Sequence, residues 1–244
     1  MDMTKRVFLG MLTPSSNTAL EPLTGAILAC LPEVSAHFGR FKVTEISLEA
    51  AALSQFNDER VLEAARLLAD AKVDVIAWSG TSAGWLGLDA DERLCERITK
   101  ETGIPATSST LALKEVMERS GRRVYGLVTP YLGVIQEKIA ANFARHGLEL
   151  LAERHLNICI NFDFSEVSEA QLETMIQEVA RAKPQCITTY CTNLRAIHLV
   201  DRLERETGIP IYDSIATAVW KSLKIAGIDT RRIKGWGSLF QEAF

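Results

Sequence analysis

The motif TGIP occurs twice in this chain, at residues 102–105 and 207–210, and the residues around it repeat as well. The first copy lies in ITKETGIPATSSTLALKEV and the second in LERETGIPIYDSIATAVWK. Each copy is also preceded by a member of a second matching pair: RVFLGMLTPSSN begins at residue 6, and RVYGLVTPYLG begins at residue 123. Strand–loop–helix units can look alike by chance. Two shared motif pairs in the same order instead indicate an internal duplication.

Short apolar runs alternate with longer amphipathic segments on either side of these motifs. The apolar runs are typical of strands buried on both faces and lie at residues 6–14, 73–80, 123–130 and 186–191. Apolar residues recur at helical spacing in residues 58–71, 89–103 and 168–183. Asp58 is placed to cap the first of these helices. The alternation predicts mainly parallel sheets with helices on both faces.

The duplication and the alternation together predict an α/β protein with two pseudo-symmetric lobes. Each lobe is expected to be a mainly parallel sheet flanked by helices, with the active site in the cleft between them. Residues 1–117 and 228–244 are assigned to the first lobe, and residues 118–227 to the second. The segment GWGSLF at residues 235–240 is expected to close the first lobe, with Gly235 and Gly237 near the cleft.

The composition bounds the class of protein. The 244 residues suffice for a substantial core, and the values of 47% hydrophobic and 24% charged residues are usual for a globular protein. A formal net charge of −4 argues against nucleic acid or an anionic membrane as partner. No apolar run approaches the roughly 20 residues of a membrane span. Five scattered cysteines favour a reduced, cytoplasmic protein. A homo-oligomer is compatible with the sequence.

The loops that follow the predicted strands carry the candidate site. In open parallel sheets, ligands bind beyond the carboxyl ends of the strands. Aligning the two halves places AWSGTS, residues 77–82, against TTYCTN, residues 188–193, with Gly80 opposite Cys191. We therefore expect a cleft lined by these two loops and by the residues after each Thr-Pro pair: Ser15, Asn17, Gly80, Thr81, Ser82, Tyr131, Cys191 and Thr192. The pocket wall is expected from residues 38–47 and 158–164.

The motifs TPSSNT, GTS, VTPY, YC, TGIP and GWGSLF, in this order, resemble the aspartate/glutamate racemase superfamily. Within it, the chain resembles the branch that holds maleate cis-trans isomerase and arylmalonate decarboxylase. The resemblance covers nearly the whole chain and implies two α/β lobes with the site between them. In the racemases that this chain resembles, one cysteine from each lobe acts, and the two lie on opposite faces of the substrate.

This chain departs from the two-cysteine pattern, because Gly80 stands where the first lobe's cysteine is expected and only Cys191 is kept. Glycine followed by Thr81 and Ser82 resembles arylmalonate decarboxylase. The PSSNT motif resembles maleate isomerase, in which the asparagine, here Asn17, contacts a substrate carboxylate. Maleate isomerase also keeps the first cysteine as its nucleophile, and Gly80 cannot serve in that role.

One thiol suits a reaction that forms a carbanion without a base and then protonates it. Decarboxylation of a 2-substituted malonate does this, and Cys191 would protonate the enediolate. Hydroxyls and backbone N–H groups would hold the remaining carboxylate, through Thr81, Ser82, Tyr131 and Thr192. A free thiol has a pKa of about 8.5 and is protonated near neutral pH. Proton delivery from one face predicts a product of single handedness.

Other interpretations stay open. The same fold with isomerisation or racemisation of a small carboxylic acid is the main alternative, and a binding protein with an inactive site is another. GTSAG at residues 80–84 matches the nucleophile-elbow pattern of serine hydrolases, with Ser82 as nucleophile, but no late histidine is well placed. Each site residue also has a structural interpretation, as packing, helix cap or turn. Cys186, His198, Trp78 and Trp85 are expected to be structural or, for the tryptophans, pocket wall.

The sequence contains no P-loop, no G-x-G-x-x-G motif and no histidine cluster. We therefore expect an enzyme without a metal or other cofactor, acting on a small carboxylate.

Overall fold

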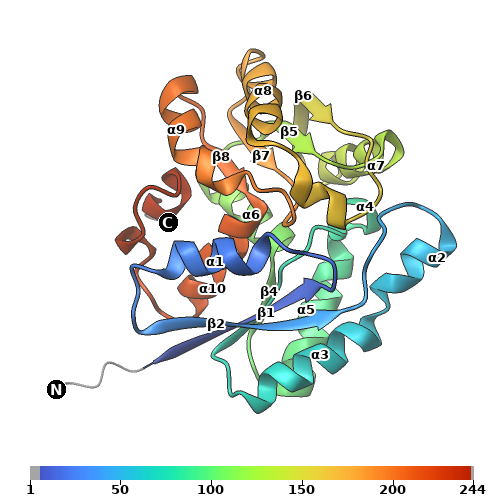
Figure 1. Ribbon diagram of the computed structural model, residues 1–244, viewed down its shortest axis with the longest axis vertical. Helices are drawn as coiled ribbons and strands as arrows, with labels where there is room; N and C mark the ends of the chain where they lie inside the picture. The colour runs from blue at the N-terminus through green and yellow to red at the C-terminus, as the bar shows by residue number, and fades with distance from the viewer. Residues whose placement is uncertain (1–5, 243–244) are drawn as a thin grey trace.

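The computed structural model describes residues 6–242 and contains two four-stranded sheets, one above the other in Figure 1. The first has the order β2-β1-β3-β4 and the second the order β6-β5-β7-β8, and all neighbouring strands are parallel. The strands are β1 (Val7–Pro14), β2 (Val34–Phe41), β3 (Val75–Trp78), β4 (Ala106–Ser108), β5 (Val124–Thr129), β6 (Glu149–His155), β7 (Cys186–Thr189) and β8 (Ile211–Asp213).

Helices cover both sheets, as the alternation predicts. They are α1 (Leu20–Leu28), α2 (Ala50–Leu53), α3 (Asp58–Asp70), α4 (Ala83–Leu86), α5 (Leu88–Thr102), α6 (Ser109–Ser120), α7 (Gly133–Ala144), α8 (Glu169–Ala180), α9 (Ile197–Thr207) and α10 (Ser214–Ile225). Single 3₁₀ turns complete the list: η1 (Ser54–Phe56), η2 (Phe162–Glu166), η3 (Thr230–Arg232) and η4 (Ser238–Gln241). The α/β fold with two parallel sheets is confirmed.

The repeated TGIP motif is a helix stop followed by a strand. Gly103 and Gly208 adopt left-handed φ values of 71° and 70° and end α5 and α9, a conformation that glycine adopts without strain. The proline two residues later cannot continue the helix. A three-residue strand follows in each half, and its last residue caps the next helix: Ser108 accepts from the Leu111 N–H, and Asp213 from the Ile215 N–H.

The predicted register of the duplication is confirmed by equivalent backbone hydrogen bonds. The Ser79 N–H donates to the Leu12 carbonyl at 3.0 Å, and the Tyr190 N–H donates to the Val128 carbonyl at 2.9 Å. Gly80 and Cys191 therefore stand at the same point beyond the central strands of the two sheets. The short helix α4 follows Gly80 and has no counterpart after Cys191.

One local expectation is wrong. Asn57, and not Asp58, caps α3, because its side chain accepts from the Glu59 N–H at 2.8 Å. The GWGSLF segment contacts the second half of the chain, because Ser238 donates to Glu204 of α9 through both its N–H and its hydroxyl, and its role in closing the first lobe stays a prediction. Any side chain at residue 237 would meet Val200 of α9, because its Cβ would lie 2.6 Å from Val200 Cγ1.

The division at residues 117 and 227 stays a prediction. The first point falls within α6, which packs along α10, and α10 contacts strands of both sheets. The two ends of the predicted first lobe, residues 1–5 and 243–244, lie outside the described residues.

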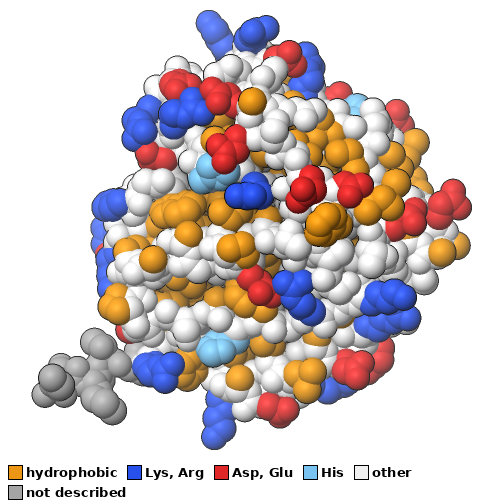
Figure 2. All heavy atoms as spheres, in the orientation of Figure 1, with side chains coloured by type: hydrophobic (Ala, Val, Ile, Leu, Met, Phe, Trp, Pro, Cys, Tyr) orange, Lys and Arg blue, Asp and Glu red, His pale blue; other side chains and the backbone are white. Residues whose placement is uncertain are grey.

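Acidic and basic side chains are interspersed on the face shown in Figure 2, with apolar patches between them. None of the helices within residues 6–242 is long and apolar enough to cross a membrane.

Candidate active site

A small cavity lies between the two sheets, where the β3 and β7 loops meet. Its volume is about 20 Å³, enough for about one water molecule. Six predicted site residues line it: Gly80, Thr81, Ser82, Tyr131, Cys191 and Thr192. The two halves are joined here, because the Thr192 hydroxyl donates to the Ser79 carbonyl at 3.0 Å.

Cys191 follows β7 and is 3% exposed. Burial raises the pKa of its thiol to about 11, against opposing hydrogen bonds from Tyr131 and the backbone of Asn193 and Leu194. The charge of buried Asp213 raises this pKa further. The thiol is therefore protonated throughout the neutral range. A buried, protonated thiol can give a proton to a carbanion, whereas it is a poor base or nucleophile in this state.

Hydrogen-bond donors surround the thiol. The hydroxyls of Thr81 and Tyr131 lie 2.6 Å apart, and burial raises the Tyr131 pKa well above its ordinary value. Within residues 6–242, no hydrogen-bond acceptor takes the backbone N–H of Thr81, Ser82 or Thr192. In a site of low dielectric, donors of this kind can stabilise an anion more strongly than they would in water.

The space beside Gly80 is filled by the Trp78 indole. A Cβ at residue 80 would lie 2.0 Å from Trp78 Cζ2, far inside van der Waals contact. Trp78 is 2% exposed and packs on Phe41 with ring centroids 5.1 Å apart. The first half therefore lacks its thiol, and the volume that a thiol would need is occupied by a rigid ring.

Asn17 and Ser15 do not line the cavity. The Asn17 amide donates to the carbonyl and hydroxyl of Thr192, each at 3.2 Å, and its Oδ1 accepts from the N–H groups of Ala19 and Leu20. It thus caps the start of α1 and braces the Cys191 loop. The Ser15 hydroxyl donates to the Val43 carbonyl at 3.4 Å on the exposed side of the loop. Direct contact of either residue with a carboxylate stays a prediction.

The remaining wall of the cavity is mostly apolar. It comes from Pro14, Ile46, Phe56, Trp78, Trp85 and Asn161. Ile46 and Asn161 fall within the two segments expected to form the wall, and both tryptophans serve as wall. Phe56 was missed, because it lies on a short 3₁₀ turn that has no sequence periodicity. The buried indole N–H of Trp85 has no acceptor within the described residues.

The structure does not support a serine hydrolase. Ser82 has ordinary helical dihedrals of −59° and −29°, whereas a nucleophile elbow is strained. All four histidines lie in the described part of the chain, and none lines the cavity. Gly84 of the GTSAG motif instead permits close packing, since a Cβ there would lie 2.6 Å from the Tyr190 ring. His198 lies beside Glu169 at 3.0 Å, and Cys186 is buried in β7.

Among residues 6–242, no group of three or more His, Cys, Asp or Glu side chains is arranged to hold a metal ion.

The fold and the site define an α/β protein with two parallel sheets and, between them, a cavity lined by one thiol, two hydroxyls and backbone N–H groups that no acceptor takes within the described residues. A profile of the arylmalonate decarboxylase family matches residues 18–240, so the chain belongs to this family. It is 27% identical to arylmalonate decarboxylase of Bordetella bronchiseptica, over 96% of this chain and 97% of that protein. It is 25% identical to maleate isomerase of Alcaligenes faecalis, over 91% and 92%.

Solved structures of both kinds of enzyme share the fold. One is Nocardia farcinica maleate cis-trans isomerase, a cysteine-to-serine mutant with a covalently bound succinylcysteine intermediate. It has a TM-score of 0.88 and 23% identity and covers 97% of this chain and 99% of its own. A crystal structure of arylmalonate decarboxylase gives a TM-score of 0.78 and 24% identity, over 97% of this chain and 100% of its own.

Proposed function

We propose that this enzyme decarboxylates a 2-substituted malonate without a cofactor. The observation that carries the proposal is the asymmetry of the cavity, with a protonated thiol at Cys191 on one side and Gly80 covered by the Trp78 ring on the other. A racemase needs an acid/base on each face of the carbon. Loss of CO2 needs no base, because the departing carboxylate leaves its electron pair on the carbon.

The site residues have separate roles in this reaction. The Thr81 and Tyr131 hydroxyls and the free N–H groups of Ser82 and Thr192 hold the carboxylate that stays. As CO2 departs, this group becomes an enediolate, and the same donors stabilise its added negative charge. The Cys191 thiol then transfers its proton to the carbon, and the resulting thiolate recovers a proton from solvent. The Tyr131 hydroxyl can stabilise that thiolate by donating to it.

The departing carboxylate is expected against the apolar part of the wall, near Ile46 and Phe56. A dry surface offers a carboxylate poor solvation and therefore favours its loss as neutral CO2.

Isomerisation of a small carboxylic acid is the second candidate, and the similarity to maleate isomerases favours it. In the Nocardia farcinica relative, a cysteine carries the succinyl intermediate. Cys191 is the one cysteine on this cavity among the described residues, so it would have to act both as nucleophile and as proton donor. Its raised pKa opposes the nucleophilic role.

Proton NMR in D2O separates the two candidates. The purified enzyme is given a panel of 2-alkyl- and 2-arylmalonates together with maleate. Decarboxylation predicts CO2 release and one deuteron at the α-carbon of the product. Conversion of maleate to fumarate, or deuterium exchange into recovered substrate without CO2 release, would replace the proposal with isomerisation or racemisation. A cytoplasmic location and a homo-oligomeric state stay predictions from the sequence.

A further inference from the structure

A second small cavity adjoins the catalytic one. Its volume is about 30 Å³, and it shares the side chains of Phe56, Trp78 and Ser82 with the catalytic cavity as common wall. Its remaining lining comes from α3, α4 and α5 and is largely apolar, apart from Asp58 and Asp91. Any substituent that passes the shared wall from the catalytic cavity would therefore meet these residues.

Asp91 is the unusual member of this lining. It is 2% exposed, and its Oδ2 has no hydrogen-bond partner. Burial raises the pKa of its carboxyl to about 7, against a smaller opposing effect of the Ser108 side chain. A buried acceptor without a donor is costly, and native proteins rarely keep one without a use for it.

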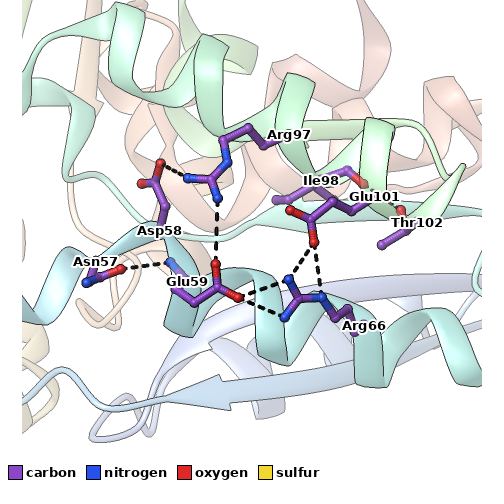
Figure 3. A network of polar contacts seen from close by, with 8 residues as sticks. All are labelled: Asn57, Asp58, Glu59, Arg66, Arg97, Ile98, Glu101 and Thr102. Atoms are coloured by element: carbon purple, nitrogen blue, oxygen red, sulfur yellow. Dashed lines mark hydrogen bonds and ion pairs between the residues drawn. The ribbon is translucent and has the colours of Figure 1, made fainter.

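Neither helix capping nor an ion pair accounts for the unpartnered Oδ2, since among the described residues the carboxyl's one hydrogen bond is with the Ser108 side chain. Asp91 lies in the first turn of α5, but no side chain caps that helix, so the carboxyl satisfies no helix N–H. The other acid of the cavity already has its partner: Asp58 lies 2.7 Å from the Arg97 guanidinium (Figure 3). Arg66 lies in the same surface network and is held by Glu59 and Glu101. No cation is therefore left over to pair with Asp91 from this network.

We propose that this cavity receives a hydroxyl group on the substrate's 2-substituent, which donates a hydrogen bond to Asp91 Oδ2. The inference rests on the proposed function for the position of the substrate, and it adds a substrate class, the 2-(hydroxyalkyl)malonates and their relatives. A hydroxyl fits better than an ammonium group, because the surrounding wall is apolar and would desolvate a charge. A volume of about 30 Å³ suits one small polar group or the water it displaces.

Ligand binding in a Cys191→Ala background tests this inference without requiring turnover. The probes are pairs of malonates with equal numbers of heavy atoms, each bearing a 2-alkyl chain of two to four carbons that ends in either a hydroxyl or a methyl group. Calorimetry gives the dissociation constant for each member. We expect the hydroxyl member of at least one pair to bind at least about tenfold more tightly than its methyl partner.

Substitution of the carboxyl should remove this preference. In Cys191→Ala/Asp91→Leu protein, the hydroxyl and methyl members should bind within about twofold of each other, with the methyl compound bound no more weakly than before. Asp91→Asn keeps an acceptor oxygen and should keep part of the preference, which protects the test if the leucine variant folds poorly. Asp58→Asn, at the other acid of the cavity, is the matched control and should leave the ratio unchanged.

Equal affinities within every pair, or a hydroxyl preference that survives Asp91→Leu, would overturn the inference. Failure of the proposed function looks different: malonates would bind with the predicted hydroxyl preference, but the wild-type enzyme would release no CO2 from any of them.

Discussion

Adding a single methyl group at Gly80 should be unusually costly, because the Trp78 ring occupies the space. The Cβ of Gly80→Ala would lie 2.0 Å from Cζ2, and an ordinary contact of 3.4 Å requires the indole to move by about 1.4 Å. The ring is buried against Phe41, so it has little room. Overpacking of this kind costs about 1–3 kcal/mol, and we expect a loss of unfolding free energy at the upper end of that range.

A double-mutant cycle assigns this cost to the ring. Trp78→Leu alone should destabilise by about 3 kcal/mol through the cavity it leaves. In that background, Gly80→Ala should cost less than about 1 kcal/mol, which gives a coupling of at least about 1.5 kcal/mol. Urea unfolding followed by circular dichroism measures all four proteins. Gly25→Ala is the control, because a Cβ at that position meets no atom within 4 Å. Additive effects of the two substitutions would refute the steric argument.

Four further outcomes follow from the site. The kcat/KM for decarboxylation should stay level from neutral pH to about 9.5 and fall near pH 11, because the Cys191 thiol must be protonated. Circular dichroism should show that the protein is still folded over this range. A fall centred near pH 9, the ordinary pKa of a thiol, would contradict this prediction. Burial raises the pKa of Asp91 from 3.8 to about 7, so the unfolding free energy should fall as pH rises from about 4 to 7, by up to about 4 kcal/mol. Asp91→Asn should flatten that part of the stability profile measured by urea unfolding. An unchanged profile would show that the carboxyl is not buried as described. Asn17→Ala should lower the unfolding free energy by about 1–2 kcal/mol, because the N–H groups of Ala19 and Leu20 lose their acceptor and the Thr192 carbonyl loses a donor; a loss below about 0.5 kcal/mol in urea unfolding would argue against the capping role. Tyr131→Phe should reduce kcat about 100-fold with little change in stability, and a reduction below threefold would remove the hydroxyl from the donor set.

The sequence predicts the two central strands and the main helix of each half because their residues are buried in regular patterns. β1, β3, β5 and β7 are nearly buried throughout, and their apolar runs are continuous. The edge strands β2 and β6 are only half-buried, so apolar and polar residues are mixed along them without a regular pattern. They contain polar residues such as His37 and Glu153 and escape a search for apolar runs.

The site is predictable where it depends on the duplication and unpredictable where it depends on packing. The alignment of repeats locates Gly80, Cys191 and Tyr131, since strand order brings their loops to one place. It cannot show that Asn17 turns its amide toward Thr192 and away from the cavity. It also cannot show that Asp91, in the first turn of a helix, is buried with one carboxyl oxygen, Oδ2, that has no hydrogen-bond partner.

The most direct test of the account is the handedness and deuterium content of the product formed by Cys191 variants in D2O. Wild-type enzyme should give one enantiomer with one deuteron at the α-carbon, and Cys186→Ala, which removes the packing thiol of β7, should give the same product at a similar rate. Cys191→Ala should lose activity by at least about 100-fold, since no other thiol in the described residues reaches the cavity. A Cys191→Ala enzyme that still forms the single enantiomer at a comparable rate would contradict the account.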